Sequence, residues 1–151
     1  MGDEMKIAIP VTVILCLVLT STTSSATLRS HKLAEVKLYD YGWQADIGFL
    51  DRLASEMQTD KDSVGYVILY GGQRNVKGEI QKRMACMKAY MLGRRGFSAD
   101  RIVIVDGGYR TNSTMEIWIA SHGERGPAPT PTVAPKSVRT KRGKIRYSCD
   151  A

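Results

Sequence analysis

Hydrophobic and polar positions follow regular patterns between residues 33 and 122. Alternation with a period of two, or a short unbroken run of β-branched residues, is typical of strands. Apolar residues that recur every three or four positions are typical of one face of a helix. In chain order these patterns predict a strand at 35–42, a helix at 46–58, a strand at 65–71, a helix at 78–96, and strands at 101–108 and 113–121.

The order of these elements predicts the fold class. A helix lies between two strands twice, and such crossovers are right-handed and imply at least partly parallel pairing. We therefore expect an α+β fold of order β-α-β-α-β-β, a two-layer sandwich with two helices on one face of a mixed sheet. The other face should be polar or covered by another segment. Asp46 is a candidate N-cap of the first helix, and the second helix should end near Gly93 or Gly96.

Both ends of the 151-residue chain differ in composition from this domain. Residues 1–26 contain the apolar run "IAIPVTVILCLVL" and end in small residues, which is typical of a cleaved signal peptide. An uncleaved membrane anchor is the alternative. Residues 123–151 are rich first in proline and threonine and then in basic residues, which predicts an extended, unpacked linker and a disordered tail.

The positive charge is concentrated in this tail. The chain has a formal net charge of +7, and residues 136–151 contain six Lys or Arg against one Asp. An exposed cationic tail would adhere to anionic polymers such as phosphorylated lipid surfaces or wall polymers. A solvated tail that only improves solubility is the alternative. Nucleic acid is not an expected partner of an exported chain.

Two cysteines, Cys86 and Cys149, would remain after signal cleavage. An oxidising compartment permits a disulfide between them. The interpretation that we favour from the sequence is that Cys86 is buried on its helix and Cys149 is unpaired in the tail. His31 and His122 lie far apart in the sequence and are expected on the surface, so the sequence predicts no metal site.

The stretch "VILYGGQRNVKGEIQKR" joins a predicted strand to a predicted helix through two glycines. Phosphate-binding loops have this layout, but Gly71, Gly72 and Gly78 match neither the dinucleotide nor the Walker spacing. We therefore predict no nucleotide and no other cofactor. The glycine pair would instead make a tight turn with positive φ, or leave backbone N–H groups facing a ligand.

A second glycine pair, in "VDGGYR", also ends a predicted strand. If the two strands are parallel, both pairs emerge at one edge of the sheet, where ligands of α/β sheets usually bind. The alternative is that Asp106 caps a turn and that Tyr109 packs against the domain. The predicted rim of this edge comprises Gly71, Gly72, Arg74, Asp106, Tyr109 and Arg110.

The segment "KRMACMKAYMLGRRGFSADRIVIVDGGYR" resembles the OmpA-like C-terminal domain, a family that holds peptidoglycan in the bacterial periplasm. Arg83 takes the place of a helix arginine of the family, "RGFSADRI" resembles its turn into the next strand, and "TMEIWI" its closing strand. The resemblance covers about residues 36–120 and implies the same fold.

The resemblance also implies a ligand. In the family, a strand-end aspartate and the helix arginine hold the ammonium and carboxylate groups of diaminopimelate. Arg83 would be the carboxylate clamp, because a guanidinium donates two parallel hydrogen bonds to a carboxylate. The chain departs from the family at the strand end, where "YGGQRN" contains no acid. Asp106 could replace it.

These observations favour an exported, non-catalytic module of the periplasm or cell envelope that binds peptidoglycan or another anionic wall component. The alternative is a degenerate scaffold that has lost wall binding and interacts with envelope proteins. An enzyme is not expected, because no nucleophile–base pair and no paired carboxylates lie at a strand end. Contact with a membrane is expected only through a retained signal segment.

Overall fold

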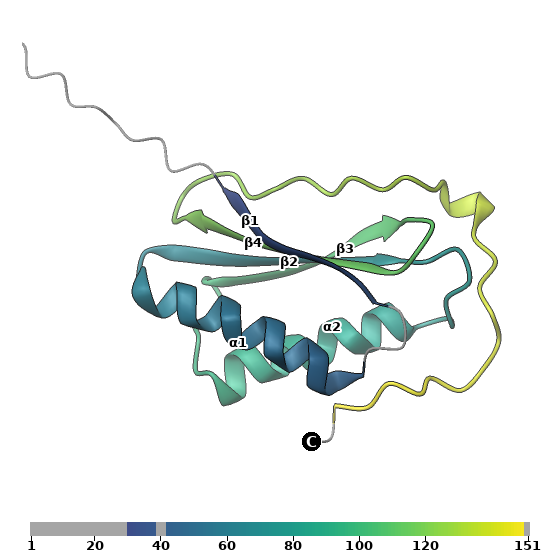
Figure 1. Cartoon of the computed structure of the whole chain (residues 1–151), viewed down its shortest axis with the longest axis horizontal. Coiled ribbons are helices and arrows are strands. Elements are labelled where there is room, and N and C mark those ends of the chain that lie inside the picture. Colours follow the sequence, from purple (N-terminus) through teal and green to yellow (C-terminus); the bar gives the residue numbers. More distant parts are fainter. Residues whose placement is uncertain (1–29, 39–41, 150–151) are drawn as a thin grey trace, which may run out of the picture.

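The computed structural model describes residues 30–38 and 42–149 (Figure 1). The predicted signal peptide and the end of the first predicted strand lie outside the described residues. The predicted α+β fold is confirmed, with its elements in the predicted order. These are β1 (His31–Lys37), α1 (Trp43–Thr59), β2 (Ser63–Gly71), α2 (Glu79–Ala89), β3 (Ile102–Tyr109) and β4 (Thr114–Ser121).

The four described strands form one mixed sheet in the order β1-β4-β2-β3. β2 and β3 are parallel, whereas β4 runs antiparallel to both β1 and β2. The two parallel strands are the ones that precede and follow α2 in the chain, as the crossover rule predicted. Both helices lie against the same face of the sheet (Figure 1).

The hydrophobic core lies between the helices and this face of the sheet. α1 contributes Leu50, Leu53 and Met57, which recur at helical spacing and are fully buried. β4 contributes Met115 and Ile117, which alternate along the strand. Full burial of such a side chain contributes about 1.5–3 kcal/mol to folding, so this layer is the main source of stability. In the part of the chain that the structure describes, no helix is long and apolar enough to cross a membrane.

The second predicted helix changes its hydrogen bonding before it ends. α2 continues into η1 (Tyr90–Arg94), a turn of π-helix. Gly96 then adopts a left-handed conformation with φ +72°, which agrees with the predicted glycine stop. The predicted cap of the first helix is wrong: the N-cap of α1 is Gly42, and Asp46 is a buried residue inside the helix.

The C-terminal segment covers the face of the sheet that the helices leave open. After β4 the chain runs back along this face, forms η2 (Pro135–Ser137), and turns towards the helices at the end of the molecule (Figure 1). The backbone N–H of Thr130 donates to the Tyr70 hydroxyl at 3.0 Å, and Val133 forms a bridge with Tyr109. The prediction of an unpacked tail is therefore wrong for residues 123–149.

This covering also explains why β4 is more buried than its pattern predicted. The sequence predicted a half-covered strand, but six of its eight residues are buried. One face packs on the helices, and Glu116 and Ala120 are buried on the other face. The sheet is thus the middle layer between two helices and an extended segment.

Candidate functional site

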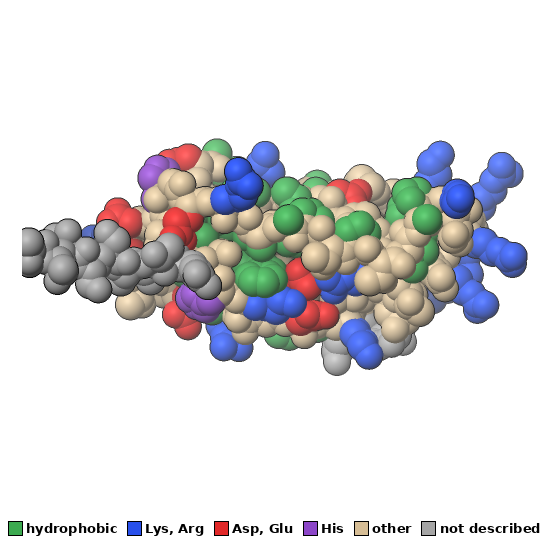
Figure 2. All heavy atoms as spheres, turned by 90° about the horizontal axis from the view of Figure 1, so that it is seen from above, with side chains coloured by type: hydrophobic (Ala, Val, Ile, Leu, Met, Phe, Trp, Pro, Cys, Tyr) green, Lys and Arg blue, Asp and Glu red, His purple; other side chains and the backbone are tan. Residues whose placement is uncertain are grey.

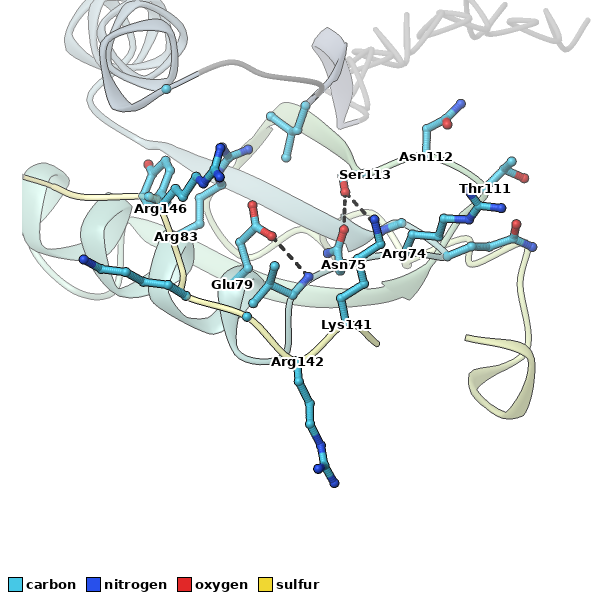
Figure 3. Close-up of a pocket in the computed structure, with 18 residues that line it drawn as sticks. Arg74, Asn75, Glu79, Arg83, Thr111, Asn112, Ser113, Lys141, Arg142 and Arg146 are labelled. Carbon is cyan, nitrogen blue, oxygen red and sulfur yellow. Dashed lines mark hydrogen bonds between the residues drawn. The ribbon is translucent and has the colours of Figure 1, made fainter. Parts of the chain in front are cut away.

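A groove of about 1000 Å³ opens at the end of the sheet where β2 stops. One side is formed by the loop that follows β2 and by the first turn of α2, and another by the loop that precedes β4. Residues 141–144, 146 and 147 of the C-terminal segment line it from the remaining side (Figure 3). Segments far apart in the sequence therefore meet around one hollow.

The side chains that line this basic groove are strongly cationic. Its only lining acid among the described residues is Glu79, whose carboxylate accepts a hydrogen bond from the backbone N–H of Val76 at 3.4 Å. Figure 2 shows Lys and Arg side chains gathered at the end of the molecule where η2 lies. In Figure 3 the side chain of Arg142 points away from the groove. The lining cations are Arg74, Arg83, Lys141, Arg142, Lys144 and Arg146.

Arg83 differs from the other five cations because it is buried. Its Nε lies 3.3 Å from Oδ2 of Asp46, and its guanidinium lies 4.4 Å from the centre of the Tyr147 ring. The Tyr147 hydroxyl donates to the same Asp46 oxygen at 2.6 Å. The exposed fractions of Arg83, Asp46 and Tyr147 are 4%, 1% and 9%, so the three groups form a buried cluster beneath the groove.

Burial sets the protonation behaviour of this cluster. Loss of solvent raises the pKa of Asp46, although the charge of Arg83 and the hydrogen bond from Tyr147 act in the opposite direction. Burial and the neighbouring Asp46 carboxylate raise the pKa of Tyr147. Tyr147 therefore remains a hydrogen-bond donor, and the positive charge of Arg83 is held inside the protein beside an acid.

The two glycines at the end of β2, Gly71 within the strand and Gly72 directly after it, serve close packing. Neither Gly71 nor Gly72 has positive φ, so the predicted left-handed turn is wrong. The N–H of Gly72 donates to Oγ of Ser113 at 3.1 Å, and therefore does not face a ligand. A Cβ atom at Gly72 would lie 2.9 Å from the backbone nitrogen of Ser113, closer than two such atoms can approach.

The residues of the predicted rim lie in three places: the basic groove, a second hollow, and, for Arg110, the other face of the sheet. β2 and β3 do end at one edge, where Gly71 pairs with Tyr109. Gly72, Arg74 and Arg83 line the basic groove. Gly71, Asp106 and Tyr109 instead border a second hollow, of about 470 Å³, beside the start of α2.

Asp106 takes part in local contacts. Its carboxylate accepts a hydrogen bond from the backbone N–H of Gly108 at 2.9 Å and another from Nε2 of Gln81 at 3.1 Å. Gly108 has φ +82° inside β3, so Asp106 supports the irregular part of this strand where the register with β2 shifts. Asp106 therefore has local contacts within the sheet and does not cap a turn. Asp106 does not line the groove that contains Arg83.

Arg110 lies on the other face of the sheet, in a network around Glu116. Its guanidinium carbon lies 3.6 Å from the centre of the Tyr70 ring, and Nη2 donates to Glu116 Oε1 at 2.9 Å. Lys32 donates to the same oxygen at 2.9 Å, and Trp118 donates to Oε2 at 3.2 Å. Burial by itself raises the pKa of Glu116, but these donors outweigh it and hold the pKa below its ordinary value. Nη2 of Arg110 also donates to Oγ1 of Thr130 at 2.7 Å, so Arg110 joins the C-terminal segment to the sheet.

A disulfide fixes the end of the C-terminal segment. Cys86 of α2 and Cys149 are bonded, with their Cα atoms 5.5 Å apart. The interpretation that left Cys149 unpaired is therefore wrong. A disulfide is consistent with an oxidising compartment outside the cytoplasm.

Sequence reasoning missed several residues of the groove. Lys141, Lys144 and Arg146 were identified only as tail charges, and Asp46 and Tyr147 were not connected with Arg83. The pair Cys86 and Cys149 was the one feature of the sequence that could have placed the tail against α2.

The arrangement of cations around the basic groove suits the binding of anions. Five of the lining cations are exposed, and a guanidinium or ammonium group beside an anion forms stronger hydrogen bonds than a neutral donor does. Comparison with known proteins does not identify a relative: no family model, no curated protein and no solved structure matches the chain.

Proposed function

We propose that this protein is a non-catalytic cell-envelope module of OmpA-like fold that binds an anionic wall polymer. The observation that carries the proposal is the basic groove, which six Lys or Arg side chains and one acid line. The element order, the mixed sheet and the disulfide support an exported domain of this kind. Its location would be the periplasm or another part of the cell envelope.

The chemistry of the groove favours an anion over the amino-acid group that the family binds. An ammonium group needs an acid as its partner, and Glu79 already accepts a hydrogen bond from Val76. Arg83 is held beside Asp46 and under the ring of Tyr147. Phosphate or carboxylate groups along a wall polymer would instead meet the exposed cations around the groove.

The alternative function is a scaffold that binds envelope proteins and no wall polymer. The buried pair of Arg83 and Asp46 favours this alternative, because the arginine that the family uses for its ligand is occupied within the protein. The missing acid at the end of β2 favours it too. Such a protein would co-purify with envelope partners and would not pellet with cell walls.

Co-sedimentation with cell-wall material tests the proposal. The protein would be mixed with insoluble peptidoglycan that retains its covalently attached phosphate polymers, and with the same material after those polymers are removed. The measurement would be made at low salt and at about 0.15 M salt, where the screening length is about 8 Å. We expect pelleting with the intact material, and weaker pelleting with the stripped material.

A matched pair of double variants locates the interaction. Lys144→Ala with Arg146→Ala removes one Lys and one Arg from the groove. Lys136→Ala with Arg139→Ala removes the same charge from exposed positions of the same segment that do not line the groove. The double variant with Lys144→Ala and Arg146→Ala should no longer pellet with the cell-wall material, and the double variant with Lys136→Ala and Arg139→Ala should still pellet. Equal behaviour of the two pairs would contradict a groove site, and no pelleting of any protein would favour the scaffold.

A further inference from the structure

The basic groove consists of two parts that are separate in the sequence. Arg74 belongs to the loop after β2, whereas Lys141, Arg142, Lys144 and Arg146 belong to the C-terminal segment. Four of the six lining cations therefore depend on where this segment lies. Because the segment has no helix or strand of its own beyond η2, other contacts must hold it in place.

The first contacts attach the segment to the loop after β2. The backbone N–H of Arg139 donates to the carbonyl of Gln73 at 3.0 Å, and that of Lys141 donates to the carbonyl of Asn75 at 2.9 Å. A parallel bridge joins Lys141 to Val76. This short ladder fixes the segment at the near end of the groove.

The second contacts attach the segment to the two helices. The Tyr147 hydroxyl donates to Asp46 of α1, and the Tyr147 ring stacks on Arg83 of α2. The disulfide then joins Cys149 to Cys86. Between these anchors and Lys141, residues 142–144 and 146 are exposed, and Ile145 is the one residue of this stretch that packs against the hydrophobic core.

Electrostatic repulsion opposes this arrangement. The cations of the segment lie around the same hollow as Arg74, and like charges that share a site repel one another. Without the far anchor, the segment would gain chain entropy and separate its charges. The ladder near Lys141 and the packing of Ile145 against the core would then be the remaining attachments.

We propose that the disulfide-anchored C-terminal segment is a functional wall of the anion site, so that high-affinity binding of a linear polyanion requires the Cys86–Cys149 disulfide. The inference rests on the proposed function. The disulfide aligns the cations of the segment with Arg74 before the ligand arrives, which lowers the entropy that binding must overcome.

Reduction would weaken this wall, because the contacts of Tyr147 and Ile145 would then hold the far end of the segment without the covalent bond. A dithiol reductant supplies two electrons and two protons; the S–S bond breaks, Cys86 and Cys149 each become a thiol, and the reductant closes its own disulfide. Cys149 is partly exposed, so a reductant can approach it. The mutual repulsion of its cations would then separate the segment from the groove for a larger fraction of the time.

Binding of a fluorescent linear polyphosphate to the oxidised protein, the reduced protein and Cys149→Ser tests this inference. We expect affinity to fall about tenfold or more in the two forms without the disulfide, because preorganised cations are lost. Far-ultraviolet circular dichroism would check that the domain remains folded. Tyr147→Phe supplies an intermediate case, because it weakens the far anchor and retains the disulfide.

The outcomes separate the inference from the proposed function. Tight binding by the oxidised protein and weak binding by both other folded forms would support the inference. Equal affinity with and without the disulfide would overturn it and leave the proposed function in place. Poly-glutamate, a linear polycarboxylate, would be the second probe for the oxidised protein. If that protein binds neither polyphosphate nor poly-glutamate, both the inference and the proposed function fail.

Discussion

The hydroxyl of Tyr147 donates a 2.6 Å hydrogen bond to the carboxylate of Asp46, which lies 101 residues earlier in the chain. This contact joins the C-terminal segment to the first helix of the domain. It lies next to the ion pair of Asp46 with Arg83, and all three side chains are buried. The C-terminal segment, as far as residue 149, is thus part of the folded domain.

Tyr147→Phe should lower the free energy of unfolding by about 1–3 kcal/mol, because a buried carboxylate loses a donor. Urea unfolding at neutral pH measures the change. Tyr66→Phe is the matched control, since the described structure gives the Tyr66 hydroxyl no hydrogen bond. An equal loss in both variants would show that the contact with Asp46 does not contribute.

The same substitution should alter the pH dependence of stability. The folded-state pKa of Asp46 is raised, so its contribution is present below the unfolded-state pKa and is lost as pH rises through the folded value. Because the Tyr147 hydrogen bond lowers this pKa, Tyr147→Phe should raise it further and extend the loss to higher pH. Unfolding free energies measured from about pH 4, near the ordinary Asp pKa, up to neutral pH test the direction.

Glu116→Gln should remove an acid-sensitive part of the stability. The folded-state pKa of Glu116 is lowered, so its contribution is present above the unfolded-state pKa of about 4.3 and is lost as pH falls through the folded value. The variant should be about 3 kcal/mol less stable at neutral pH, because Lys32 and Arg110 lose a buried charged partner. Its stability should also vary less in acid.

Urea unfolding between about pH 3 and pH 7, a range that spans the ordinary Glu pKa, measures this prediction. Glu56→Gln, at an exposed position of α1, is the control. A wild-type curve and a Glu116→Gln curve that run parallel throughout this range would contradict the role assigned to Glu116.

Loss of the disulfide should lower stability by about 4 kcal/mol, the value that the chain-entropy model gives for the 63-residue separation of Cys86 and Cys149. Cys149→Ser retains the buried position of Cys86 and is the suitable variant. Thermal unfolding of the variant would be compared with that of the wild type with and without a dithiol. A reductant should shift the wild type and leave the variant unchanged; a shift of both would point to an effect other than disulfide cleavage.

Gly107→Ala should destabilise the sheet by about 1–3 kcal/mol, the usual cost of overpacking. A Cβ atom there would lie 2.5 Å from the ring of Tyr70 and 2.7 Å from Ile68. Gly48→Ala is the control, because no atom lies within 4 Å of the added Cβ and the position is an exposed part of α1. That change should stabilise the helix by about 0.5–1 kcal/mol, and urea unfolding of both variants would show opposite signs.

The sequence predicted helices and strands correctly where the apolar residues of a segment followed a single period. The alternation of Met115 and Ile117 and the spacing of Leu50, Leu53 and Met57 follow from the geometry of a strand and a helix. Both patterns correspond to buried faces in the structure. They are local properties, so they could be recognised without knowing what each element packs against.

The candidate site was predicted only in part. Arg74 and Arg83 do line one groove, but Asp106 and Arg110 lie elsewhere. The prediction that β2 and β3 end side by side is confirmed. The sequence could not show on which face of the sheet each side chain lies after the bulge between Leu69 and Gly71. Such a bulge changes which face a following side chain meets, and the sequence carries no clear sign of it.

Local patterns in the sequence are enough to predict the order of the elements, the periodic core and the positive charge of the tail. The position of that charge depends on long-range contacts, because Tyr147 and Cys149 reach their partners Asp46 and Cys86 across long separations in the chain. Composition described the tail as polar and extended, and an extended segment can be solvated or can cover a sheet. The buried contacts with the helices and the covalent bond selected the second arrangement, since together they offset the entropy of ordering the segment.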